Sequence, residues 1–151
     1  MIALDTNLLV YAHREDSPNH DAAAGVLSRL ASGVAPFAVP WPCLHEFLAV
    51  VTHPRIYDPA STTEQGLAAL DALVSLPQVR LLYETDRHLD LLAELVGEGV
   101  VGPRVHDARI AAICLGHGVS ELWTADRDFS WFPSLRTRNP LARGEGLPGR
   151  G

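Results

Sequence analysis

The sequence predicts an α/β protein with three α/β/α layers, in which helices cover both faces of a mainly parallel sheet of about four or five strands. Two observations lead to this prediction. Short apolar runs that suit buried strands recur along the 151 residues, and longer stretches with helical spacing of apolar residues separate them. Strands separated by helices need crossover connections, which make the strands parallel within one sheet.

The N-terminal half combines two expected strands with four expected helices. Proline bounds the second strand on both sides, and Pro18 after Ser17 marks the start of a helix. The Ser-Thr-Thr-Glu sequence at 61–64 has the spacing of a capping box before an amphipathic segment. In chain order we expect a strand at 2–4, helices at 8–12 and 19–31, a strand at 37–39, and helices at 42–53 and 62–74.

The C-terminal half is expected to contain two strands and two helices. Asp86 is placed to cap the first of these helices, and Gly118 ends the second. In chain order we expect a strand at 79–83, helices at 87–96 and 107–117, and a strand at 121–124. We expect one domain over residues 1–142, followed at 143–151 by a flexible tail rich in glycine and arginine.

The composition excludes several classes of protein. All 12 basic residues are arginine, which rules out the lysine-dependent mechanisms of P-loop enzymes, Schiff-base enzymes and kinases. Cys43 and Cys114 lie in separate apolar stretches, so we expect buried thiols rather than zinc ligands or a disulfide. Asp5 comes too early for a secretory signal, and no apolar run reaches the roughly 18 residues of a membrane span. We therefore expect a cytoplasmic protein without membrane contact.

Acidic residues occupy the positions where a parallel sheet gathers ligands, at strand ends and helix starts. They are Asp5, Glu46, Asp107, Asp126 and Asp128. Taken singly, most have a structural alternative: Asp107 suits a helix cap, and Asp126 or Asp128 suits a turn. Glu46 alone suits an exposed position on a helix. Asp5 is harder to explain in this way, because it interrupts a buried strand.

Considered together, the five acids indicate a metal site. If the first and fourth strands are neighbours, four or five carboxylates converge, and their mutual repulsion requires a divalent cation. Oxygen ligands without histidine or thiolate spacing favour magnesium or manganese over zinc. A site with such an ion is suited to phosphodiester hydrolysis, in which the metal activates water. The residues therefore predict metal-assisted phosphoryl chemistry.

Four short motifs, at 2–7, 42–47, 106–112 and 124–129, resemble those of one known family, the PIN-domain ribonucleases. The opening Ile-Ala-Leu-Asp-Thr-Asn at 2–7 is similar to the first strand of the family, which ends in Asp-Thr-Asn or Asp-Thr-Ser. Residues 42–47 resemble the helix that carries its glutamate, residues 106–112 its third acidic motif, and residues 124–129 its Thr-x-Asp-x-Asp-Phe motif. Size and spacing resemble VapC-type toxins of type II toxin–antitoxin systems.

The resemblance implies a PIN-like fold and a magnesium-dependent endoribonuclease toxin, with manganese as a possible substitute. Such a toxin hydrolyses structured RNA (tRNA or rRNA), inhibits translation, forms a homodimer and is neutralised by a cognate antitoxin. The implied catalytic acids are Asp5, Glu46, Asp107 and Asp126, of which Asp5 and Asp107 are implied metal ligands. Implied supporting residues are Thr6, Asn7, Thr124 and Asp128. Whether Asp126 or Asp128 faces the metal stays open.

Arginines are the candidates for RNA contact. The segment from Arg136 to the C-terminus holds four arginines against one glutamate, which suits either a solvated tail or phosphate contacts. Arg136 and Arg138 are the expected substrate-binding residues. Arg104, Arg109 and Arg127 flank the acids and are alternative partners for them. Setting the five clustered acids aside changes the formal net charge from −6 to −1, which is less unfavourable for RNA.

Other motifs and functions are less well supported. Residues 144–149 match GxGxxG but neither follow a strand nor open a helix, and Ala49 replaces the second histidine of an HExxH motif that starts at His45. A metal-dependent phosphatase of another α/β family is one alternative function, although Asn7 stands where its second acid is expected. The other is a non-catalytic PIN-like binding module, which would be expected to have lost an acid.

Overall fold

Five short parallel strands form one sheet in the order β3-β2-β1-β4-β5. The computed structural model describes residues 1–142, so the flexible tail predicted at 143–151 and the rejected motif at 144–149 lie outside the described residues. The strands are β1 (Ile2–Leu4), β2 (Phe37–Pro40), β3 (Val79–Leu82), β4 (Glu121–Trp123) and β5 (Thr137–Arg138). The prediction of a parallel sheet of four or five strands is confirmed.

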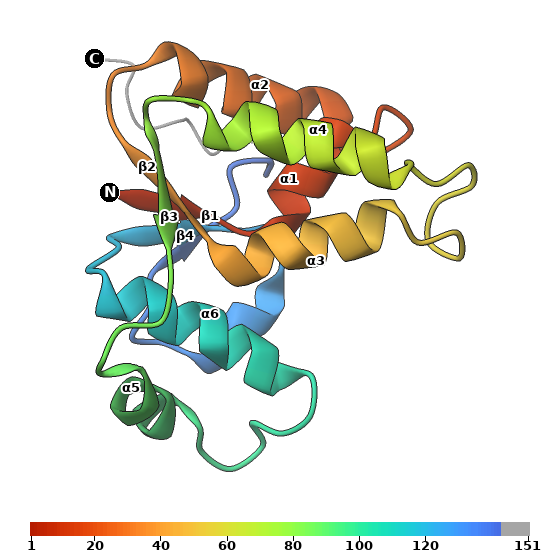
Figure 1. Cartoon of the computed structure of the whole chain (residues 1–151). Coiled ribbons are helices and arrows are strands. Elements are labelled where there is room, and N and C mark those ends of the chain that lie inside the picture. Colours follow the sequence, from red (N-terminus) through yellow and green to blue (C-terminus); the bar gives the residue numbers. More distant parts are fainter. Residues whose placement is uncertain (143–151) are drawn as a thin grey trace.

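The helices form layers on both sides of the sheet, as predicted. Figure 1 shows α2 and α4 on one side of the strands, and α5 and α6 on the other. The helices are α1 (Thr6–His13), α2 (His20–Ser32), α3 (Trp41–Val51), α4 (Thr63–Val74), α5 (His88–Leu95) and α6 (Arg104–Gly116), and η1 (Arg127–Trp131) is a 3₁₀-helix. The sheet is therefore covered on both faces, which explains why its central strands β1 and β2 are continuously apolar.

The centre of the sheet determines where the site lies. Ala3 of β1 pairs with Ala38 of β2 on one side and with Leu122 of β4 on the other. At the end of β1, Leu4 is level with Trp123, and the Asp5 amide donates to the Trp123 carbonyl over 3.0 Å. Two strands that are far apart in sequence therefore end side by side at the same edge.

The structure corrects several predicted helix starts. The capping box uses Thr62 and Gln65 rather than Ser61 and Glu64. Neither Ser17 nor Asp86 is an N-cap, because α2 and α5 begin after other residues and have no side-chain cap. α6 begins at Arg104, three residues earlier than expected. These shifts of one to three residues are the usual uncertainty of local capping patterns, because packing selects among neighbouring starts.

Strand β5 had no counterpart among the expected elements. Its two residues are polar, and the strand exists because the backbone amides of Leu122 and Thr124 donate to the carbonyls of Arg136 and Arg138, each over 2.8 Å. Those partners are far apart in sequence, so no local pattern predicts the pairing.

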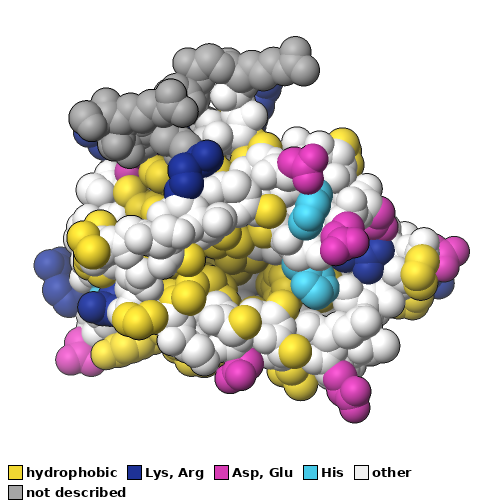
Figure 2. All heavy atoms as spheres, turned by 90° about the horizontal axis from the view of Figure 1, so that it is seen from above, with side chains coloured by type: hydrophobic (Ala, Val, Ile, Leu, Met, Phe, Trp, Pro, Cys, Tyr) yellow, Lys and Arg dark blue, Asp and Glu magenta, His cyan; other side chains and the backbone are white. Residues whose placement is uncertain are grey.

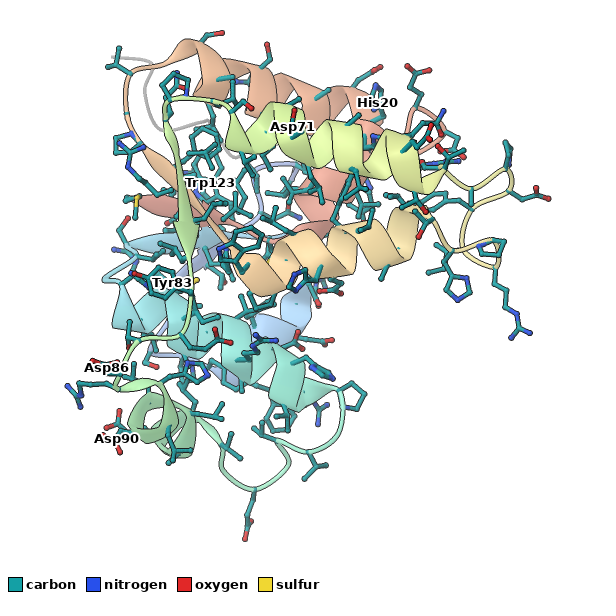
Figure 3. All side chains as sticks on the ribbon, in the orientation of Figure 1. His20, Asp71, Tyr83, Asp86, Asp90 and Trp123 are labelled. Atoms are coloured by element: carbon teal, nitrogen blue, oxygen red, sulfur yellow. The ribbon has the colours of Figure 1, made fainter. Side chains whose placement is uncertain are left out.

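Acidic residues outside the edge of β1 and β4 are dispersed. Figure 3 shows Asp71 on α4, and Asp86 and Asp90 near α5 on the opposite side of the molecule. No helix within residues 1–142 is long and apolar enough to cross a membrane.

We predict that the stability of this fold depends strongly on α6. The Ile113→Ala variant should lower the free energy of unfolding by about 2–5 kcal/mol, because Ile113 is 1% exposed and its loss leaves a cavity. Leu89→Ala on α5 is the control, because Leu89 is 76% exposed, and should change it by less than about 0.5 kcal/mol. Urea denaturation followed by circular dichroism measures both, and equal losses would contradict the assigned core.

Candidate active site

The carboxyl ends of β1 and β4 bring two motifs together. Asp5 follows β1 and is the N-cap of α1, and Thr124 follows β4. The Thr124 hydroxyl donates to Asp5 Oδ2 over 2.7 Å, which links the ends of the two strands through their side chains. The expectation that the first and fourth strands are neighbours is therefore confirmed.

Asp5 is held by several donors at once. It is 4% exposed. Its Oδ1 accepts from the Thr6 amide at 2.8 Å and from the Cys43 thiol at 3.7 Å, and its Oδ2 also accepts from Asn7 Nδ2 at 3.4 Å. A buried carboxylate is costly unless donors or a cation compensate for it. All the donors around Asp5 are neutral, so they orient the side chain but leave its negative charge uncompensated.

Asn7 and Thr6 extend this network to the neighbouring acids. The Asn7 amide group donates to Thr124 and accepts from the Ala125 amide, each at 3.2 Å. The Thr6 hydroxyl donates to Glu46 Oε2 over 2.9 Å. Glu46 projects from α3, which begins directly after β2. Three of the four predicted supporting residues, Thr6, Asn7 and Thr124, therefore contact the acids or the loop that carries them.

Three more carboxylates meet beside this pair. Oxygens of Asp107, Asp126 and Asp128 lie within 4.8 Å of one another. Asp107 lies in the first turn of α6, and Asp126 precedes η1, whose Asp128 amide donates to Asp126 Oδ1 over 2.8 Å. Asp107 is therefore not a helix cap, whereas Asp126 does cap η1. The Asp126 amide in turn donates to Thr124 Oγ1 over 2.9 Å, which ties this loop to the end of β4.

The acids line one cavity of about 280 Å³, with Asp5, Glu46, Asp107 and Asp126 among its walls. An adjoining cavity shares Glu46, Asp107 and Asp126 and is also lined by Asp128. Asp126 is thus the acid of its motif that shares a cavity with Asp5, whereas Asp128 is exposed and does not. His45 and His106 line the adjoining cavity.

Burial and mutual repulsion raise the pKa of two of these acids. Burial raises the pKa of Asp5 to about 6, and the charges of Glu46 and Asp126 add to the rise, although hydrogen bonds from Thr124 and Thr6 oppose it. Burial likewise raises the pKa of Asp107 to about 6, with the charges of Asp126 and Asp5 as further causes. Negative charge at this edge of the sheet is therefore unfavourable without a cation.

The flanking arginines do not supply that cation. Arg109 forms an ion pair with Glu84, and the Arg104 guanidinium lies 4.0 Å from the centre of the Trp131 ring. Arg127 is exposed and makes no ion pair among residues 1–142. The donor set is thus made of carboxylate oxygens with neutral hydroxyl and amide groups around them, which suits magnesium or manganese.

Arg136 and Arg138 lie farther from the acids. Arg138 ends β5 and pairs in register with Trp123, so it belongs to the same edge of the sheet, one strand beyond Thr124. Arg136 directly precedes β5 and is exposed. Substrate contact by either residue stays a prediction.

Several residues that line the cavity or contact its acids were not among the predicted site residues. Tyr11 and Tyr57 line the cavity, and the Cys43 thiol reaches Asp5. Tyr11 follows Asn7 by four residues on α1, a spacing that places both on one helix face and was readable from the sequence. Tyr57 lies in the loop between α3 and α4, for which no periodicity gives a position.

A separate apolar groove lies on the side of α2 and α4. Figure 2 looks onto this side and shows a hydrophobic hollow in its middle. The α2/α4 groove has a volume of about 200 Å³ and is lined by Leu9, Ala12, His13, Leu27, Phe47, Ala69, Leu70 and Leu73.

The fold is a parallel α/β/α arrangement in which acids follow the first and fourth strands and lie on α3 and α6. This combination defines a class of domains with a metal site, and comparison with known proteins identifies the family. The chain belongs to the PIN-domain family, which matches residues 2–133. The family predicted from four short motifs is confirmed.

Its relatives are named as VapC proteins. Ribonuclease VapC43 of Mycobacterium tuberculosis is 35% identical over 142 residues, covering 93% of this chain and 96% of its own. Ribonuclease VapC31 of the same organism is 36% identical over 141 residues, covering 93% and 99%. The solved structure of VapBC2 from Rickettsia felis bound to a promoter DNA fragment is 23% identical, with a TM-score of 0.67 over 92% of this chain and 98% of that chain. This likeness supports the fold.

The raised pKa of Asp107 leads to a stability prediction. A carboxyl whose pKa is higher in the folded protein than its usual 3.8 binds protons more tightly when folded, so stability falls as pH rises from about 4 through about 6. Asp107→Asn removes this penalty. Because Asp107 is partly exposed, solvent screening limits the gain at pH 7 to about 1 kcal/mol, or ~2–4 °C in melting temperature.

Differential scanning fluorimetry of metal-free protein tests this. The variant should melt higher than the wild type at pH 7 and at the same temperature at pH 4, where the carboxyl is protonated. Asp71→Asn, an exposed acid on α4, is the control and should show no difference at either pH. A lower melting temperature of Asp107→Asn at pH 7 would mean that Asp107 stabilises the fold.

Proposed function

We propose that the protein is a magnesium-dependent endoribonuclease toxin, in which manganese can substitute, and that it hydrolyses phosphodiester bonds in structured RNA (tRNA or rRNA) and thereby inhibits translation. The observation that carries the proposal is the convergence of Asp5, Glu46, Asp107 and Asp126 on one cavity, whose lining within residues 1–142 includes no arginine. We further propose that residues 1–142 form the single catalytic domain and that it acts in the cytoplasm.

The acids are proposed to have different roles, which depend on their positions in the cavity. Asp5 and Asp107 carry the pKa values raised to about 6, so they gain most from a bound cation and are proposed as its direct ligands. Glu46 and Asp126 line the same cavity and are proposed to hold the attacking water and the remaining coordination positions. A bound magnesium ion would lower the pKa of water and stabilise negative charge on the phosphate.

Neutral residues are proposed to position these acids. Thr124 and Asn7 fix the Asp5 carboxylate, and Thr6 fixes Glu46 through its hydroxyl. Such groups orient ligands without competing for the charge of the metal. The exposed Asp128 is proposed as a supporting residue, because its amide holds Asp126 and its carboxylate adds to the negative potential.

The relatives support RNA as substrate. VapC43 and VapC31, each at least 35% identical along almost the whole chain, are both named ribonucleases. With the five site acids set aside, the remaining formal charge is −1, so RNA meets a nearly neutral protein surface. Arg136 and Arg138 are proposed to bind backbone phosphate beside the carboxyl end of β4.

We also propose that a cognate antitoxin binds this protein and that the chain forms a homodimer. VapBC complexes are among the similar solved structures. The α2/α4 groove suits the apolar face of a partner helix.

Ala69→Arg should fill the groove and abolish antitoxin binding measured by calorimetry, whereas Leu67→Arg, also on α4 but outside the groove, should not. Light scattering of the purified protein tests the dimer.

We predict that Asp107→Asn lowers RNA cleavage by roughly a hundredfold or more. The Asp107 side chain makes no hydrogen bond or ion pair within residues 1–142, so its replacement should remove charge from the site and leave the fold intact. Cleavage of a labelled RNA pool on a denaturing gel, with and without EDTA, measures the effect, and Asp71→Asn is again the control. Wild-type cleavage by Asp107→Asn protein, or wild-type activity in EDTA, would refute the proposal.

The raised pKa values predict how cleavage depends on pH. Asp5 and Asp107 must be deprotonated to bind a cation, so cleavage at low magnesium should rise with pH through about 6. More magnesium should move the midpoint to lower pH, because the cation competes with the protons. Initial rates from pH 5 to 8 at two magnesium concentrations test this, and a midpoint that does not move would contradict it.

A further inference from the structure

The cavity that holds the acids has a second half of different chemistry. Val10, Tyr11, Val50 and Tyr57 line it together with the carboxylates. None of these side chains can serve as a magnesium ligand or a general base at neutral pH, so hydrolysis does not account for them. An aromatic and apolar wall next to a phosphate-cleaving centre therefore needs its own explanation.

Helix geometry sets the distance between the two halves. Tyr11 follows Asn7 by four residues on α1, and Val50 follows Glu46 by four residues on α3. In each helix the apolar residue thus lies about one turn, ~5.4 Å, beyond a residue of the acidic half. That spacing is on the scale that separates a phosphate from the base of the same nucleotide.

Tyr57 is held in place by contacts to the end of α1. The Arg14 guanidinium lies 4.3 Å from the centre of the Tyr57 ring, where a cation–π interaction is favourable. Arg14 is itself fixed by an ion pair with Asp16 at 2.6 Å and by hydrogen bonds to the Pro59 carbonyl at 3.0 Å and Ser61 Oγ at 3.2 Å. A side chain in a long loop is therefore preorganised at the wall of the cavity.

Tyr57 also remains uncharged at neutral pH. Burial raises the pKa of its hydroxyl above the usual 10, and the nearby Asp16 carboxylate adds to the rise. A neutral phenol does not repel a polyanionic strand, and its ring offers a surface on which any base can stack.

We propose that this apolar half is a base-binding subsite for the unpaired nucleotide next to the scissile phosphate, with Tyr57 and Tyr11 as the residues that contact the base. The inference rests on the proposed function, and it specifies at which kind of nucleotide the RNA is cleaved. A base that is paired and stacked within a helix cannot enter a cavity of about 280 Å³ beside the carboxylates, so cleavage selects loops or bulges.

The adjoining cavity gives the strand a path. It shares Glu46, Asp107 and Asp126 with the first cavity and is also lined by Pro42 and Pro103, which do not line the first cavity. A strand whose base occupies the tyrosine side would therefore pass its phosphate over the shared acids and leave along this second cavity. The bases on the two sides of the cleaved bond then meet different surroundings. We therefore expect the base on one side of the bond to contribute more to cleavage than the base on the other side.

The test removes single bases from RNA. Short stem–loop RNAs that the wild-type protein cleaves are mapped, and abasic versions are made at each nucleotide that flanks the cleaved bond. We expect loss of the base on one side to lower kcat/KM of the wild type by roughly 5- to 100-fold, and loss on the other side to have a smaller effect. Equal cleavage of all three RNAs would overturn the inference.

Variants link the effect to the tyrosine. Tyr57→Leu should reduce kcat/KM for intact RNA by a similar factor. This variant should then cleave intact and abasic RNA with the same kcat/KM. Tyr57→Phe keeps the ring and should discriminate as the wild type does, which also reports on folding. Tyr83→Leu is the matched control, because Tyr83 is 60% exposed, lies directly after β3 against His117 at the end of α6, and does not line the cavity. Wild-type discrimination by Tyr57→Leu protein would overturn the inference.

A binding measurement separates this inference from the proposed function. The Asp107→Asn protein is mixed with RNA that carries 2-aminopurine at the sensitive nucleotide, whose fluorescence falls when it stacks on an aromatic ring. We expect quenching by Asp107→Asn and little quenching by the Asp107→Asn, Tyr57→Leu double variant. If the labelled RNA is quenched but the wild-type protein does not cleave it, the nuclease proposal is refuted and the base-binding subsite is supported. If the wild-type protein cleaves the RNA but no quenching occurs, the nuclease proposal is supported and the base-binding subsite is refuted.

Discussion

The hydrogen bond from Thr124 to Asp5 is the contact on which the site depends. It joins the ends of β1 and β4, which are separated by most of the chain but lie side by side in the sheet. Through Thr124 and Asn7 the same network holds the loop that carries Asp126. One buried carboxylate thus organises both strand ends, and its position follows from the parallel register of the sheet rather than from any contact near it in sequence.

The network orients negative charge without neutralising it. Hydroxyl, amide and thiol donors surround Asp5, while the nearby Arg109 and Arg104 are engaged by Glu84 and Trp131 instead. Arginine paired with the acids would stabilise the fold but would occupy the site of a cation. The protein therefore retains electrostatic repulsion at the carboxyl edge of the sheet, which a divalent ion can relieve. This is a common compromise between stability and function.

Two helices give the cavity its two halves. α1 and α3 each begin beside the acids and run away from the edge of the sheet, so each places a site residue in one turn and an apolar residue in the next. The loop after α3 returns to the end of α1, where Arg14 fixes Tyr57. The same elements that position the carboxylates thereby shape the space next to them, and an RNA strand would meet charge and aromatic surface in turn.

The sequence by itself determined the parallel α/β class, most elements to within a few residues and the acids of the site. These depend on local patterns: apolar runs, capping residues and motifs such as Asp-Thr-Asn at 5–7. The tertiary structure alone decided that β5 pairs with β4, that Arg109 pairs with Glu84, and that Tyr57 lines the same cavity as the acids. Each of these depends on how segments that are separated in sequence pack together, which no local pattern encodes.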